Sequence, residues 1–223
     1  MLMQQYFISP IFIVHLRAFQ NFTFRFIDTN MYKISNHTAC LPFEDYIAGY
    51  RDKNKFIEFC KQCRQYGNCW VCPPYDFDME QYLSGFEIVY VIGTKITPGE
   101  EARSKFNTPE KAQEAGREML AEVRKIIDPK LLELEKQYPD SKAFFAGTCF
   151  QCTEGECTRK KGKPCIHPGR VRPSLEAFGF DIGKTASDLL HIDLKWSKDG
   201  SLPEYFTLVS GFLTNDPAAF VVI

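Results

Sequence analysis

Several catalytic signatures are absent from this 223-residue sequence. No G-x-G-x-x-G follows a strand-like segment, which excludes the dinucleotide-binding fingerprint. Neither the H-E-x-x-H of zinc proteases nor the G-x-S-x-G of serine hydrolases is present. The C-x3-C-x2-C arrangement of radical enzymes that use S-adenosylmethionine is also missing. Gly183-Lys184-Thr185 matches only the end of a P-loop, because Phe178 stands where that motif requires a glycine.

The sequence also lacks an excess of charge and a long apolar run. Its 27 Lys and Arg and 28 Asp and Glu give a formal net charge of −1, which predicts no partner through bulk electrostatics. The apolar run Tyr6–Leu16 is too short to span a bilayer. We therefore expect no membrane association. At 44% hydrophobic residues, the chain can bury a core without cross-links.

The first thirty residues do not have the pattern of an export signal. No positive charge precedes the apolar run, Pro10 and His15 interrupt it, and no small-x-small cleavage site follows. We hypothesise that residues 1–30 are translated upstream sequence and that Met31 is the true start; an export signal is the alternative. Without export the compartment is the cytosol, where paired thiols indicate metal ligands more than disulfides.

The remaining sequence predicts one α+β domain over residues 31–223. Its expected elements are two short helices within 43–59, a central strand at 86–96, a helix that begins at Thr108-Pro109, and strands at 142–146, 189–196 and 206–213. Pro129 divides or kinks the long helix in this prediction. The fold class is a central antiparallel or mixed sheet with helices on one face and two cysteine-rich metal loops.

Nine cysteines are the distinctive feature of the composition, and eight of them form two quartets. The upstream quartet has the spacing C-x2-C-x5-C-x2-C and consists of Cys60, Cys63, Cys69 and Cys72. The downstream quartet has the spacing C-x2-C-x4-C-x7-C and consists of Cys149, Cys152, Cys157 and Cys165. Such closely spaced cysteines are typical of thiolate metal sites. The ninth, Cys40, is expected to be a core thiol.

Thiolates bind zinc and iron–sulfur clusters. A zinc ribbon separates its two CxxC pairs by roughly 15–20 residues, and the upstream insert is much shorter. A cluster is larger than an ion and accepts ligands from one continuous loop; Cys72 is followed by a proline, as in bacterial ferredoxins. The spacing therefore favours one or two iron–sulfur clusters (4Fe-4S), with zinc as the alternative. Disulfides and unliganded thiols are further alternatives.

Basic residues surround the downstream cysteines and agree with a negatively charged cluster. Those expected to tune it are Arg159, Lys160, Lys161, Arg170 and Arg172. A patch that binds nucleic acid is disfavoured, because Phe150 is the only aromatic residue among these charges. His167 could replace a cysteine in a zinc site, but a loop histidine is the simpler interpretation, and His191 is expected to be structural.

Two stretches resemble a prokaryotic family of small, cysteine-rich predicted metal-binding proteins of unknown function. They are CKQCRQYGNCWVCPP at 60–74 and CFQCTEGECTRKKGKPCIHPGRVRPSLEAFGFDI at 149–182, and the likeness covers about residues 40–215. The resemblance implies that seven of the eight cysteines bind a metal or cluster; it does not assign Cys69. It implies no established reaction.

The sequence thus predicts a cytosolic metal-binding protein with iron–sulfur clusters, a redox or electron-transfer role and a redox partner protein. One rival is a zinc-stabilised interaction module. Another is an iron–sulfur enzyme in which Cys69 is not a ligand and one iron stays open to substrate.

Overall fold

The computed structural model describes residues 31–152, 156–197, 199–219, 221 and 223. Residues 1–30, for which a start at Met31 is hypothesised, lie outside the described residues. Within the described residues, no helix is long and apolar enough to cross a membrane.

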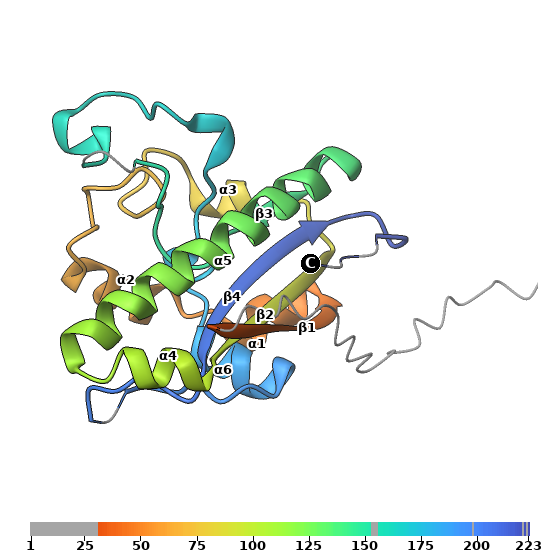
Figure 1. Cartoon of the computed structure of the whole chain (residues 1–223). Helices are drawn as coiled ribbons and strands as arrows, with labels where there is room; N and C mark the ends of the chain where they lie inside the picture. Colours follow the sequence, from red (N-terminus) through yellow and green to blue (C-terminus); the bar gives the residue numbers. More distant parts are fainter. Residues whose placement is uncertain (1–30, 153–155, 198, 220, 222) are drawn as a thin grey trace, which may run out of the picture.

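Four antiparallel strands form one open sheet in the order β1-β2-β4-β3 (Figure 1). The strands are β1 (Tyr32–Pro42), β2 (Ile88–Pro98), β3 (Lys142–Phe144) and β4 (Phe206–Thr214). The helices are α1 (Phe43–Tyr50), α2 (Lys53–Gln62), α3 (Met79–Leu83), α4 (Glu100–Lys105), α5 (Pro109–Gln137) and α6 (Ile182–Lys184). Short 3-10 turns η1 (Thr158–Lys161), η2 (Pro168–Arg170) and η3 (Glu176–Phe178) and a π turn η4 (Thr185–Leu189) complete the fold. The prediction of an α+β domain with a central antiparallel sheet is confirmed.

Strand β2 lies in the middle of the sheet, as its nearly continuous apolar sequence predicts. Ile92 and Ile96 contribute to the core beneath α5, whereas Val89 and Val91 contribute to the core on the opposite face. Figure 1 shows α5 crossing the first face. The second face is not open to solvent: side chains from α1, α3 and the chain between η3 and Ile192 cover it. Helices therefore lie on both faces of the sheet, whereas the sequence predicted helices on one face.

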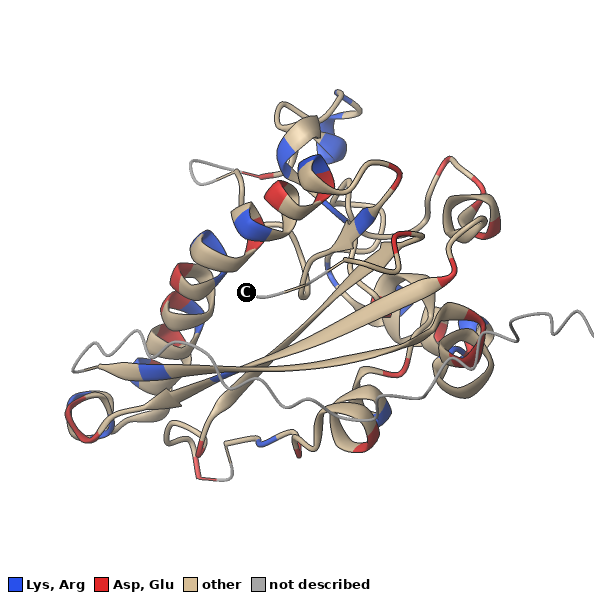
Figure 2. Cartoon of the chain, turned by 90° about the vertical axis from the view of Figure 1, so that its right-hand side faces the viewer, with Lys and Arg blue, Asp and Glu red and all other residues tan. Residues whose placement is uncertain are grey.

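Helix α5 begins where the sequence predicts, because the Thr108 side chain accepts a hydrogen bond from the Lys111 N–H and Pro109 occupies the first turn. It then continues through Pro129 as one helix to Gln137, so Pro129 does not divide it. Charges of both signs alternate along its length (Figure 2). Its buried side, which includes Met119, Val123 and Ile127, packs on the sheet.

The strand predicted at 189–196 is wrong. His191 has a φ of +54°, a left-handed conformation that does not fit a β-strand. Leu190 and Ile192 instead pack over Gly93 of β2, where a Cβ atom would lie 2.7 Å from Ile192 Cδ1. The segment thus covers the sheet rather than joining it, and β4 pairs with β2 and β3.

Strand β1 was not expected from the sequence, because polar residues interrupt its apolar alternation. Asn36 is buried, accepts a hydrogen bond of 2.7 Å from the Thr94 hydroxyl of β2 and donates one to the Ile223 carbonyl. A buried polar side chain is stable when its hydrogen bonds are made inside the protein. Tertiary partners therefore permit a strand that the local sequence does not indicate.

Candidate metal centre

The upstream cysteine loop follows helix α2. The Asp52 side chain caps this helix by accepting the Lys55 N–H, and Cys60 lies in its last turn. Cys63 ends the helix, and bends continue through Pro74. No residue of α2 is buried, and the following loop buries Cys69, Val71 and Pro73. This region therefore contributes little to the hydrophobic core.

The downstream cysteine loop is closed at its base. After β3, the Phe145 N–H donates to the Pro173 carbonyl at 3.0 Å, which holds the two ends of the loop together. At Gly179, just beyond the loop, φ is +89° and a Cβ atom would lie 2.6 Å from Lys53 Cα. Only glycine fits this approach without a shift of backbone. It brings the end of η3 against the start of α2, and so brings the supports of both loops together.

The two cysteine loops lie side by side at one end of the molecule (Figure 1). The Trp70 indole N–H donates to the Lys163 carbonyl at 3.0 Å. The Arg159 guanidinium donates to the carbonyls of Cys69 at 2.8 Å and Cys72 at 2.6 Å, and also to the Pro74 carbonyl. Its carbon atom Cζ lies 5.2 Å from the centre of the Trp70 ring. An arginine of the downstream loop thus holds the backbone of the upstream loop.

Three thiols from both loops meet at Thr148. The Thr148 hydroxyl lies 3.8 Å from the Cys69 sulfur and 3.7 Å from the Cys72 sulfur. Cys69 is also hydrogen-bonded to the thiols of Cys149 and Cys72. These hydrogen bonds lower the pKa of Cys69, while donation to Cys69 followed by burial raises the pKa of Cys72 and of Cys149. The thiols of the two loops therefore interact with one another.

The other predicted ligands lie around this contact. Burial raises the pKa of Cys152, and the charges of Cys157, Cys165 and Cys69 raise it further. Burial also raises the pKa of Cys60, followed by the charges of Glu176 and Cys63. These mutual effects require that the thiols lie within electrostatic range of one another. Cys63 is exposed, whereas Cys69 is buried.

Backbone amides support two of the downstream sulfurs. The Gln151 N–H donates to Cys149 Sγ and the His167 N–H donates to Cys165 Sγ, each at 3.4 Å. Such N–H···S bonds are typical of thiolate sites, where they stabilise negative charge. His167 therefore contributes its backbone to this site.

No three His, Cys, Asp or Glu side chains within the described residues form a group that could hold a single metal ion. The donors nevertheless have the right chemistry, because eight cysteines of the two loops lie at one end of the fold and thiolates bind zinc, iron and iron–sulfur clusters. The structure thus brings the predicted ligands to one region and leaves their grouping into sites untested.

The five basic residues predicted to surround the cysteines have different surroundings. Arg159 binds the upstream loop, as described above. Lys160 pairs with Glu156, and Arg172 pairs with Glu135 of α5 through Nε at 2.8 Å. Lys161 and Arg170 are exposed to solvent. Of the five, Arg159 therefore has the most direct contact with the cysteine loops.

Sequence reasoning missed a buried ion pair that supports the site. Arg124 and Asp128 of α5 are both buried, with a distance of 2.8 Å between Nη2 and Oδ2. The same guanidinium donates to the Thr148 carbonyl and lies 4.7 Å from the centre of the Phe150 ring. The sequence could have predicted this pair, because the two opposite charges lie four residues apart on the buried side of α5. Cys40, by contrast, is exposed on β1, outside both loops, so the prediction of a core thiol is wrong.

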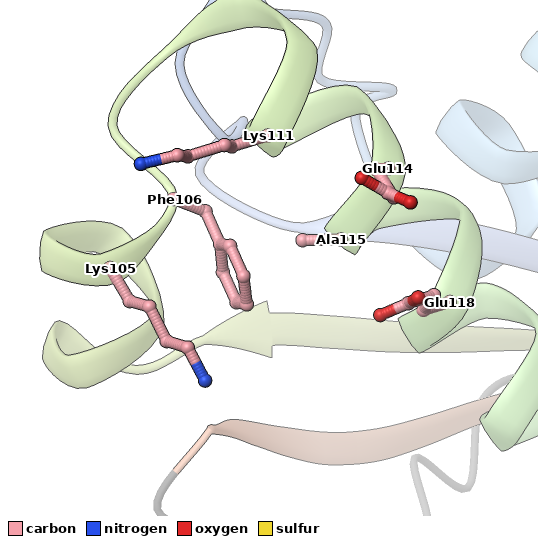
Figure 3. Close-up of a pocket in the computed structure, with 6 residues that line it drawn as sticks. All are labelled: Lys105, Phe106, Lys111, Glu114, Ala115 and Glu118. Atoms are coloured by element: carbon pink, nitrogen blue, oxygen red, sulfur yellow. The ribbon is translucent and has the colours of Figure 1, made fainter.

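A pocket of about 350 Å³ lies away from the cysteines, between α4 and the start of α5 (Figure 3). Phe106 and Ala115 form its floor, and the charged residues around them are exposed. Their charges are of both signs, namely Lys105, Lys111, Glu114 and Glu118. Exposed charges of this kind are usual on a protein surface. The pocket therefore indicates no specific chemistry.

Comparison with known proteins agrees with the cysteine geometry. Residues 48–213 match the model of the family described as "Predicted metal-binding protein (DUF2284)". The chain belongs to this family of predicted metal-binding proteins. No curated protein and no solved structure matches the chain. The family match covers both cysteine loops, together with α5 and most of the sheet.

Proposed function

We propose that the cysteines of the two loops hold one or two iron–sulfur clusters and that the protein transfers single electrons or senses redox state. The observation that carries this proposal is the way the two loops are joined: Arg159 of the downstream loop donates to the carbonyls of Cys69 and Cys72, and the hydroxyl of Thr148, the neighbour of Cys149, lies 3.8 Å from the Cys69 sulfur. A bound cluster would supply a one-electron couple. The protein residues would hold it, shield it from solvent and offset its negative charge.

The arrangement of donors supports a cluster over a single zinc ion. Each quartet comes from one short continuous segment, and the insert between the two upstream CxxC pairs is much shorter than that of a zinc ribbon. Because a cluster is wider than an ion, it takes thiolates from a wider ring. The amide donors at Cys149 and Cys165 and the guanidinium of Arg159 would stabilise the reduced, more negative state.

The environment of Cys69 favours its role as a ligand. It is 3% exposed and accepts hydrogen bonds from two other cysteines. Its sulfur lies 3.8 Å from the Thr148 hydroxyl and its carbonyl accepts a hydrogen bond from Arg159, so the downstream loop holds Cys69 at the junction of the two loops. This observation weakens the rival proposal of an enzyme whose upstream site has three ligands and an open iron.

A redox partner protein would dock beside the clusters. Phe150 and Ile166 of the downstream loop are 46% and 64% exposed, next to the exposed cations Lys161 and Arg170. Apolar side chains among cations suit a partner with an acidic surface. The proposal also needs a reducing compartment, for which we infer the cytosol, since exposed thiols such as Cys63 would be oxidised elsewhere.

Anaerobic purification followed by iron, sulfide and zinc analysis tests the proposal. We expect iron and acid-labile sulfide in equal amounts and a reversible one-electron couple in a redox titration. Zinc without sulfide would instead establish a zinc-stabilised interaction module. If iron and sulfide are present but no reversible couple is found, the redox role is contradicted and the cluster is retained.

Serine variants then test how the cysteines are grouped. If one shared cluster spans both loops, Cys69→Ser removes all iron; if there are two clusters, it removes the iron of one. Cys60→Ser probes the upstream loop alone. Cys40→Ser is the matched control, since Cys40 lies on β1, and it should retain full iron content. Iron that is unchanged in every loop variant would contradict the assignment.

A further inference from the structure

A second, larger pocket lies where strand β3 ends early. β3 pairs only with Gly211–Leu213 of β4, so no described strand pairs with Phe206–Ser210 on that side. The chain leaves the sheet because the Phe145 N–H bonds to Pro173 and Gly147 turns with a φ of +66°. The space left at the strand edge is a pocket of about 810 Å³. This volume lies within the range of small-molecule sites.

The pocket has walls from distant parts of the chain. The first half of α5 forms one side, and residues 194–197 and 200–203 close the other, where a Cβ atom on Gly200 would lie 2.5 Å from Pro109. Figure 1 shows this segment running beside α4 and the start of α5. The apolar part of the lining includes Leu120, Leu194, Phe206 and the exposed indole of Trp196. An aromatic or aliphatic group would therefore find apolar contacts there.

Two oxygen atoms of the pocket lining lack partners. The Glu176 Oε2 atom and the Thr207 hydroxyl are inaccessible to solvent and have no hydrogen-bond partner among the described residues. A buried polar atom without a partner costs free energy, and a bound ligand can remove that cost. Burial also raises the pKa of Glu176, which shows how poorly its charge is compensated. The cations of the lining, Arg117 and Lys195, are exposed; Ser174 and the charge of Arg124 act on the carboxyl group, but its Oε2 atom has no partner among the described residues.

We infer that this pocket binds a small amine with an apolar or aromatic body, whose ammonium group donates hydrogen bonds to Glu176 and Thr207. An ammonium ion has three donors and no acceptor, which matches a carboxylate oxygen and a hydroxyl that line one pocket and lack partners among the described residues. The apolar body would lie against Leu120, Leu194 and Trp196. This inference does not depend on which metal the cysteines bind or on how the cysteines are grouped into sites.

The pocket is nevertheless next to the cysteine loops. Ala146 and Gly147 line it, and Thr148 and Cys149 follow directly in the sequence. Glu176 lies within electrostatic range of both Cys60 and Arg124. An amine bound at Glu176 would therefore add positive charge near the proposed clusters, a position suited to a substrate or an effector of the redox centre.

Calorimetric titration with phenethylamine at neutral pH tests the inference on the full chain, purified anaerobically with its metal. We expect saturable binding. The Glu176→Gln variant should bind roughly tenfold more weakly, the typical loss for one charge-assisted hydrogen bond. Thr207→Val should lose a few-fold, and the neutral isostere 2-phenylethanol should bind the wild type about tenfold more weakly. In NMR spectra the Trp196 indole signal should shift, and the Trp70 signal should not.

The matched control is Glu110→Gln, the same chemical change at an exposed carboxylate that lines the same pocket. It should bind phenethylamine like the wild type. Equal affinity of Glu176→Gln and wild type would overturn the inference, as would a lack of saturable binding by the wild type at millimolar phenethylamine. If Glu176→Gln does not fold, the Thr207→Val variant and the comparison of phenethylamine with 2-phenylethanol still test the inference. Metal content is measured separately, so a failed cluster proposal and a failed pocket proposal remain distinguishable.

Discussion

Strand β2 lies between two neighbouring strands and two apolar layers, whereas helix α2, which carries Cys60, buries none of its residues. The loop after α2 is attached by a few polar contacts: Trp70 to Lys163, Arg159 to three carbonyls, and Thr148 to two sulfurs. Apolar burial drives folding over the whole sheet, but directional bonds hold each of these loops. From this difference we expect apolar packing to keep the sheet folded, and the cysteine loops to depend on these polar contacts and on the proposed metal.

The largest expected effect is that of metal removal. Chelation under anaerobic conditions should increase amide hydrogen exchange in 60–74 and 147–170 by at least about a hundredfold, because binding free energy is lost from these loops. Strands β2 and β4 should keep their protection, since apolar packing supports them. Hydrogen-exchange mass spectrometry measures both regions at once. Equal loss of protection in sheet and loops would remove the contrast between the two regions.

Substitution of Arg124 should destabilise both α5, which packs on the sheet, and the downstream cysteine loop. Arg124→Met leaves the Asp128 carboxylate buried without its cation and the Thr148 carbonyl without its donor. Loss of one partner of a buried pair costs about 3–5 kcal/mol of unfolding free energy. Lys125→Met, at the exposed neighbouring position, is the matched control and should change stability little. Denaturant unfolding measures both variants, and a loss similar to that of the control would show that the pair is not structural.

This substitution should also depend on pH. Burial raises the pKa of Asp128 in the folded state above its ordinary value of 3.8. An acid with a raised folded pKa is uncharged in both states at low pH, and its destabilising effect grows as pH rises through the unfolded and then the folded pKa. Without Arg124 this effect increases. The Arg124→Met penalty should therefore be smaller at acid pH than at neutral pH, which unfolding curves at both pH values check.

Substitution of Arg159 should affect the loops alone. Arg159→Met removes three hydrogen bonds to the carbonyls of Cys69, Cys72 and Pro74. We expect a local loss of about 2 kcal/mol and faster release of metal, because these donors are charged and half-buried. Arg170→Met is the control, an exposed arginine of the same loop. A global change in the unfolding midpoint without faster metal release would contradict this local role.

The smallest effect concerns an ion pair at the edge of the cysteine region. The Arg51 guanidinium donates to both oxygens of Glu80, at 2.6 Å and 2.8 Å, and lowers the pKa of Glu80 to about 2. Stability from a lowered carboxyl pKa is present above the unfolded value of 4.5 and is lost as pH falls toward about 2. Glu80 is half-exposed, so solvent screening limits the contribution to about 0.5–1 kcal/mol. Glu80→Gln should flatten the acid limb of the stability curve, whereas Glu58→Gln on α2 should not.

Much of the fold followed from local sequence. The Thr108-Pro109 start of α5, the two short helices α1 and α2 and the central strand β2 are all as predicted. Each depends on side chains within a turn or two of one another. The missed strand β1 and the wrong strand at 189–196 depend on partners far along the chain, such as Thr94 for Asn36 and Gly93 for Leu190.

The sequence by itself determined that two groups of four thiols would lie in short loops with basic residues around them, because ligand spacing is a local property. Only the tertiary structure decided that Cys69 lies beside Cys149, that Arg124 reaches Thr148, and that the Oε2 atom of Glu176 lacks a partner among the described residues at the pocket. These contacts join residues that are tens of residues apart. Their formation depends on how the sheet and α5 direct the chain, and no local pattern contains that information.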